Sequence, residues 1–101
     1  GGNEVTFVST VINGNLSYTG GTSADTITFT SDAVANVVGG RVSINTGGGA
    51  DTVSIDGAAA AGAGTTSFGS LYVNFGVGSG SDVFTNNSGI DFDIFIYNFT
   101  P

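Results

Sequence analysis

Three segments of this 101-residue sequence repeat one pattern, and the repeat limits the fold more than any other feature. GNLSYTGGTSADTITFT from Gly14 aligns without a gap with GRVSINTGGGADTVSID from Gly40, and GSLYVNFGVGSGSDVFT from Gly69 follows with two additional residues before its aspartate. Each copy contains a glycine, a short alternating strand, a glycine-rich turn that ends in aspartate, and a second alternating strand. We therefore expect a single all-β domain over residues 1–101, with repeat units at 14–30, 40–56 and 69–85.

The alternation within each copy predicts which side chains form the core. Successive residues of a strand point to opposite faces, so apolar residues at every second position share one face, and Ser, Thr and Asn share the other. The 18 glycines and the spacing of apolar residues argue against helices. The predicted core face contains Leu16, Tyr18, Ile27, Phe29, Val42, Ile44, Val53, Ile55, Leu71, Val73, Phe75 and Phe84.

Two all-β architectures fit this pattern. The favoured one is a short parallel β-solenoid-like stack of about three coils with extra terminal strands, in which each copy pairs with the copies above and below it. A β-sandwich is the alternative, because several short strands separated by turn signals describe that fold as well.

In a solenoid the equivalent positions of successive coils stack one strand spacing apart, about 4.7 to 4.9 Å. Asp25, Asp51 and Asp82 would then form a column of like charges that repel each other. Three arrangements offset the repulsion: side chains that point into solvent, carboxylates that cap N–H groups of their own turn, or a cation between coils. The neighbouring glycines favour the cation, because residues without Cβ let carbonyl oxygens converge on a small ion.

The aspartate turns resemble the calcium-binding repeat-in-toxin nonapeptide, Gly-Gly-x-Gly-x-Asp-x-apolar-x. GGTSADTIT from Gly20 departs from it at Ser23, and TGGGADTVS from Thr46 and VGSGSDVFT from Val77 lack the first glycine. The chain is also similar to bacterial extracellular surface proteins with spaced GxGxD turns, whereas repeat-in-toxin nonapeptides run in tandem. The resemblance implies calcium as cofactor and the ligands Asp25, Asp51, Asp82, Gly21, Gly47, Gly49, Gly78 and Gly80; the alternative is that these aspartates only form turns.

Charge and missing residue types exclude several functions. The net charge of −7, with Arg41 as the only base, argues against nucleic acid and anionic membranes as partners. Without His, Cys, Lys or Met the chain lacks the usual general bases and nucleophiles, so we do not expect an enzyme. Asp91 and Asp93 resemble the carboxylate pair of a hydrolase, but no substrate-binding signature accompanies them. No apolar run is long enough to span a membrane.

The terminal segments 3–12 and 91–99 are apolar on both faces. In the second, the pattern places Phe92, Ile94 and Ile96 on one face, with Phe95, Tyr97 and Phe99 on the other. Strands of this kind are normally covered on both sides, and the chain has little charge or proline to protect open edges. The segments thus predict β-augmentation between subunits through Val5, Phe7, Val11, Phe92, Ile94, Phe95, Ile96, Tyr97 and Phe99.

Together these features favour a secreted structural subunit. Head-to-tail contacts do not close, so we expect a homopolymeric extracellular filament that calcium stabilises. The alternative is a carbohydrate- or surface-binding module of a larger adhesin, with Tyr18, Tyr72 and Tyr97 as contacts. Three sequons are candidate glycosylation sites, at Asn15, Asn86 and Asn98.

Overall fold

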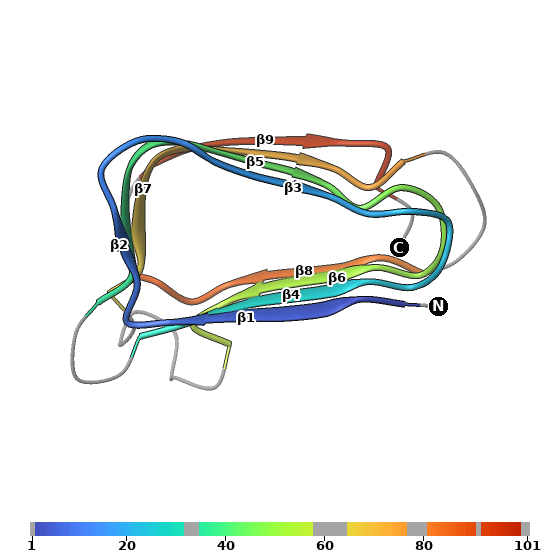
Figure 1. The fold of residues 1–101 in the computed structure, drawn as a ribbon, viewed down its shortest axis with the longest axis horizontal. Coiled ribbons are helices and arrows are strands. Elements are labelled where there is room, and N and C mark those ends of the chain that lie inside the picture. The colour runs from blue at the N-terminus through green and yellow to red at the C-terminus, as the bar shows by residue number, and fades with distance from the viewer. Residues whose placement is uncertain (1, 32–34, 58–64, 77–80, 91, 100–101) are drawn as a thin grey trace.

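The computed structural model describes residues 2–31, 35–57, 65–76, 81–90 and 92–99, which form two parallel β-sheets and no helix (Figure 1). None of these residues therefore belongs to a helix that could cross a membrane. The first sheet has the order β1-β4-β6-β8, with β1 Glu4–Val8, β4 Thr26–Thr30, β6 Thr52–Ile55 and β8 Val83–Asn86. The second has the order β2-β5-β7-β9, with β2 Val11–Ile12, β5 Val37–Asn45, β7 Ser67–Asn74 and β9 Asp93–Tyr97; β3 Leu16–Thr19 also pairs with β5.

The chain passes back and forth between the two sheets, and each circuit lies on the previous one (Figure 1). Every paired strand is parallel to its neighbour, and the neighbour belongs to the next coil. This arrangement is a β-solenoid of about three turns, as the repeat predicted. The β-sandwich alternative is wrong, because its sheets would be built from antiparallel strands.

The register of the strands confirms the sequence alignment and extends it. Leu16 pairs with Val42 and Val42 with Leu71, the positions that the repeat makes equivalent. The same register continues into both terminal segments, where Glu4 pairs with Thr26 and Leu71 with Ile94. The segments expected as extra strands therefore form the first and last coils of the stack.

The core lies between the sheets and continues from coil to coil. Its buried hydrophobic residues are Ile27, Phe29, Val38, Val42, Ile44, Val53, Ile55, Phe68, Leu71, Val73 and Phe75. A file of four aromatic rings, Phe7, Phe29, Phe68 and Phe92, follows the stack with centroid distances of 4.8, 4.9 and 5.2 Å. Burial of one such side chain contributes about 1.5–3 kcal/mol, so the core is the main source of stability.

The predicted orientation of the Phe99 side chain is wrong. Phe99 was expected on the outer face with Phe95 and Tyr97, but its ring packs on the buried ring of Phe75 with a centroid distance of 5.3 Å. Asn98 explains the difference, because its φ of 57° is left-handed and interrupts the alternation of the strand.

Candidate functional site

The repeated aspartates lie at the turns that lead into β4, β6 and β8, and their side chains are buried. Asp25, Asp51 and Asp82 are 1%, 0% and 6% exposed. The carboxylates therefore do not point into solvent, which was one of the three arrangements considered.

Each carboxylate binds a backbone N–H of the preceding coil. Oδ1 of Asp25 accepts from the N–H of Asn3 at 3.0 Å, Oδ1 of Asp51 from the N–H of Asp25 at 2.9 Å, and Oδ1 of Asp82 from the N–H of Asp51 at 3.1 Å. We call Asn3, Asp25, Asp51 and Asp82 the aspartate ladder. The carboxylates thus cap N–H groups, but those of the neighbouring coil rather than of their own turn. They hold consecutive coils together at this corner.

The second carboxylate oxygen has a different environment. Oδ2 of Asp25 and Oδ2 of Asp51 are buried without a hydrogen-bond partner. Burial raises the pKa of the Asp51 carboxyl; the Thr46 side chain and the Asp25 N–H oppose the rise, and the charges of Asp25 and Asp82 add to it. The net effect favours the neutral form of Asp51 in the folded protein.

The glycines assigned to calcium are required by the turn itself at two positions. Gly47 and Gly49 have φ of +76° and +99°, a region that side chains disfavour. A Cβ on Gly47 would also collide with the carbonyl oxygen of Gly21 in the preceding coil, whereas a Cβ on Gly21 would meet open space. Gly78 and Gly80 lie outside the described residues.

The described residues do not complete a calcium site. Calcium takes six to eight oxygen ligands. Within the described part of the chain no group of three or more acidic, His or Cys side chains could hold a metal ion. Asp25, Asp51 and Asp82 each use Oδ1 to accept an N–H. The described carboxylates alone therefore do not complete such a site, and calcium at these turns stays a prediction for experiment.

A second corner of the coil contains a polar network that the sequence did not reveal. Asp56 accepts hydrogen bonds from the N–H of Ser31 and from both the N–H and the hydroxyl of Thr66, each at 2.9 Å. Asn36 accepts from the N–H of Thr10 at 2.7 Å and donates to the carbonyl of Phe7 at 3.3 Å. Asp56 ends the second repeat unit, where the first copy has threonine, and Asn36 and Thr66 lie between units, so only their polarity beside predicted core strands signalled burial.

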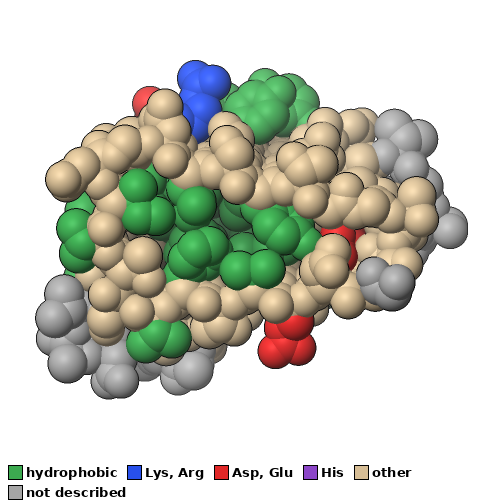
Figure 2. Space-filling model, viewed as in Figure 1, with side chains coloured by type: hydrophobic (Ala, Val, Ile, Leu, Met, Phe, Trp, Pro, Cys, Tyr) green, Lys and Arg blue, Asp and Glu red, His purple; other side chains and the backbone are tan. Residues whose placement is uncertain are grey.

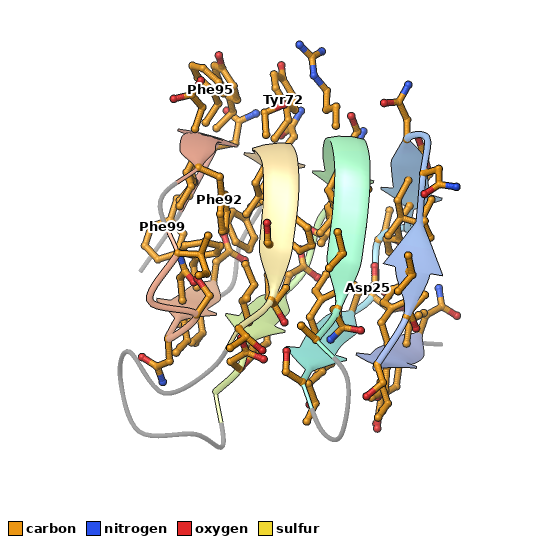
Figure 3. All side chains as sticks on the ribbon, turned by 90° about the vertical axis from the view of Figure 1, so that its left-hand side faces the viewer. Asp25, Tyr72, Phe92, Phe95 and Phe99 are labelled. Atoms are coloured by element: carbon orange, nitrogen blue, oxygen red, sulfur yellow. The ribbon has the colours of Figure 1, made fainter. Side chains whose placement is uncertain are left out.

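The outer face of the second sheet carries an aromatic patch, which we define as Tyr72, Phe95 and Tyr97. The rings of Tyr72 and Tyr97 are 4.9 Å apart, and Phe95 and Tyr97 are 48% and 45% exposed. Cζ of Arg41 lies 6.0 Å from the centroid of the Tyr72 ring. Figure 3 shows Tyr72 and Phe95 projecting outward, while Phe92 and Phe99 lie inside the coil.

A polar hollow of about 220 Å³ adjoins the aromatic patch. Tyr72 and Arg41 border it, and Ser17, Thr19, Ser43 and Asn45 are among the residues that line it. Tyr18, predicted as an exposed contact, also lines it, but the Tyr18 hydroxyl is buried and has no hydrogen-bond partner. Tyr18 packs against the core rather than standing in solvent.

The residues predicted to drive assembly lie in the two terminal coils. Looking down the solenoid axis, Figure 2 shows hydrophobic side chains uncovered between the two sheets. The first coil contributes Val5 and Phe7, which are half-buried, and Val11, which is 61% exposed. The last coil contributes the half-buried Phe92 and the exposed Ile94, Phe95, Ile96, Tyr97 and Phe99.

The remaining predicted sites are dispersed. Oδ1 of Asn15 accepts the N–H of Arg41 at 2.8 Å, Oδ1 of Asn86 accepts the N–H of Ser88 at 3.1 Å, and Nδ2 of Asn98 donates to Asn74 at 2.9 Å. Asn15 and Asn98 are exposed, so they are the more accessible of the sequons. Of the suggested carboxylate pair, Asp93 is exposed and Asp91 lies outside the described residues.

Comparison with known proteins finds no matching family model, no similar curated protein and no similar solved structure. Functional interpretation therefore depends on the geometry of the chain itself.

Proposed function

We propose that this chain is a structural subunit that polymerises head to tail along the solenoid axis. In this arrangement the first coil of one copy stacks on the last coil of another. One observation carries the proposal: both terminal coils keep the register of the stack, and both leave the core uncovered at the ends.

The register of the sheets defines the junction. Thr52 pairs with Val83, and Thr26, one coil earlier, pairs with Glu4. Continuing this order past β8 places the partner's β1 beside it, with the partner subunit's Thr6 next to Thr85. In the second sheet the partner's β3 follows β9 in the same way.

This register continues the core across the junction. The column Val42, Leu71, Ile94 would be followed by the partner subunit's Leu16. Ile94 is 37% exposed and Leu16 is half-buried in the single chain, so the contact covers apolar surface on both copies. Parallel pairing at both edges would also satisfy backbone groups that the end strands present to solvent.

Charge supports the same junction. The aspartate ladder begins with Asn3, a neutral residue at the position that holds aspartate in the other coils. A polymer would therefore place Asn3, and not a fourth carboxylate, over Asp82. Secretion to the cell exterior is part of the proposal and is supported by the resemblance of the turns to those of bacterial surface proteins.

Engineered cysteines test the junction, because the chain contains no cysteine of its own. Thr6 and Thr85 lie on the outer side of the first sheet, three coils apart within one chain. That separation, about 14 Å at a strand spacing near 4.8 Å, is too long for an internal disulfide. In the proposed junction the two residues are neighbours on adjacent strands, at a Cα distance that a disulfide can bridge.

The double variant Thr6→Cys/Thr85→Cys should give a ladder of covalent oligomers on non-reducing gels after mild oxidation. Glu4→Cys/Thr85→Cys is the matched control: the same face is used, but the pair is two residues out of register and should cross-link far less. Negative-stain microscopy of the unmodified chain should show filaments. A monodisperse monomer at high concentration, or equal cross-linking of both pairs, contradicts the proposal.

A further inference from the structure

We infer that the polymer forms, at each junction, a groove that binds a neutral polysaccharide chain. The inference rests on the proposed polymer, because one wall of the groove comes from a partner subunit. It concerns the outer face of the second sheet, where the aromatic patch and the polar hollow lie side by side.

The residues of this face follow one another in register. One column is Ser17, Ser43, Tyr72 and Phe95, and the next is Thr19, Asn45, Asn74 and Tyr97. The first two coils therefore present small polar side chains, and the aromatic rings stand only on the later coils. In a single chain the polar hollow has a wall on one side, formed by Tyr72 with Arg41.

The other side of the hollow is open in the single chain, because β3 is an edge strand. In the polymer the strand beyond β3 is the partner's β9. This strand brings Phe95 of the partner subunit beside Ser17 and Tyr97 of the partner subunit beside Thr19. The hollow becomes a groove two strands wide, with aromatic walls whose backbones are three strand spacings apart, about 14 Å.

The chemistry of this groove suits sugar rings. Its floor offers hydroxyl and amide groups from Ser17, Thr19, Ser43 and Asn45, which donate and accept hydrogen bonds without carrying charge. Its walls offer ring faces for the apolar C–H surfaces of a sugar, and tyrosine adds a polar tip at the wet edge. A ligand for such a groove needs flat apolar faces and a rim of hydroxyls, which a polysaccharide has.

Other occupants fit less well. The net charge of −7 disfavours nucleic acid and acidic polysaccharides. An extended peptide pairs with an open strand edge, and in the polymer the edges beside the groove are already paired. A neutral polysaccharide is therefore the occupant that the floor, the walls and the charge favour together.

Glycan-array binding by three labelled samples tests the inference. These are the unmodified polymer, the disulfide-linked Thr6→Cys/Thr85→Cys polymer, and a Val5→Lys variant that places a charge in the junction far from the groove. Circular dichroism first shows that Val5→Lys is folded, and sedimentation reports the assembly state of every sample. Dilution of the unmodified chain below its assembly concentration supplies a second monomer sample.

Both polymers should bind neutral oligosaccharides on the array, and the monomer samples should bind them at least tenfold more weakly. Tyr72→Ala and Phe95→Ala should each weaken binding by the polymer tenfold or more, whereas Thr28→Ala, on the outer face of the first sheet, should not change it. A polymer that binds no neutral glycan overturns the groove and leaves the polymer standing. Monomers that bind as tightly as the polymer overturn the shared groove, and failure to polymerise overturns both proposals.

Discussion

Replacement of Asp51 by asparagine and by alanine separates two roles of the aspartate ladder. The side chain is fully buried, and its Oδ1 accepts the N–H of Asp25 at 2.9 Å. Its Oδ2 is buried without a hydrogen-bond partner. Asn keeps an acceptor at Oδ1 and removes the charge, whereas Ala removes both. Asn3 supports the first replacement, because an asparagine already occupies the equivalent position in the first coil.

The structure sets the size of the expected difference. Asp51→Ala leaves the N–H of Asp25 without its acceptor, and an unsatisfied buried donor costs about 1–3 kcal/mol. For a domain of this size each kcal/mol shifts the melting temperature by about 4–8 °C. Asp51→Ala should therefore melt at least about 4 °C below Asp51→Asn.

The pH dependence follows from the raised pKa of Asp51. Burial raises this pKa above its ordinary value of 3.8, so the folded state holds the proton more tightly than the unfolded chain does. The corresponding stability is fully present below pH 3.8 and is lost as the pH rises through the raised pKa of the folded state. Asp51→Asn has no such loss, so it should be more stable than the unmodified protein at pH 7, and the advantage should shrink towards pH 4.

Thermal unfolding followed by circular dichroism from pH 4 to 8, at protein concentrations below assembly, measures these differences. The reasoning is refuted if Asp51→Asn is less stable than the unmodified protein at pH 7 and the deficit disappears in acid. That result would mean that the ionised carboxylate stabilises the fold, as it would beside a bound cation.

Three further predictions concern the turns and the core. Gly47→Ala should destabilise the fold by more than about 1 kcal/mol, because the alanine would be strained at φ +76° and would collide with the preceding coil. Gly21→Ala is the control and should be tolerated, because its Cβ meets open space. Urea unfolding measures the stability of both variants. Tyr18→Phe removes a buried hydroxyl without a partner and should stabilise by about 1 kcal/mol, whereas Tyr97→Phe, at an exposed ring, should be neutral in the same assay. Calcium and a chelator should leave the melting temperature unchanged, because the described carboxylates do not form a calcium site; a rise of several degrees with calcium would contradict this.

The repeat favoured the solenoid because three copies of one pattern can bury the same face when they stack. In such a stack equivalent residues such as Leu16, Val42 and Leu71 must pair in register, whereas alternation alone would also fit a β-sandwich. The terminal coils were harder to recognise, because they contain only half of the pattern. Asn3 to Phe7 matches Asp25 to Phe29 position by position, but asparagine stands where the other coils have the aspartate that marks the turn.

The orientation of the aspartates could not be read from the sequence. A glycine-rich turn that ends in aspartate permits a carboxylate that faces solvent, a metal or a neighbouring N–H, and the pattern is the same for all three. The choice depends on the path of the preceding coil, which brings the N–H of Asp25 within 2.9 Å of Asp51. The position of Phe99 could not be predicted from the sequence either. Strict alternation would place its ring on the same face as Tyr97, but the left-handed φ of Asn98 turns it toward Phe75.

The aspartate ladder also gives the solenoid a direction. In each rung the earlier coil donates its N–H and the later coil accepts with a side-chain oxygen, and all strand pairs are parallel. A head-to-head contact between two copies would reverse both patterns at the junction, whereas a head-to-tail contact preserves both. Asn3 carries a side-chain carbonyl, so it can accept a hydrogen bond without adding charge to the column. The polymer should therefore be polar, with every subunit oriented in the same direction along its axis.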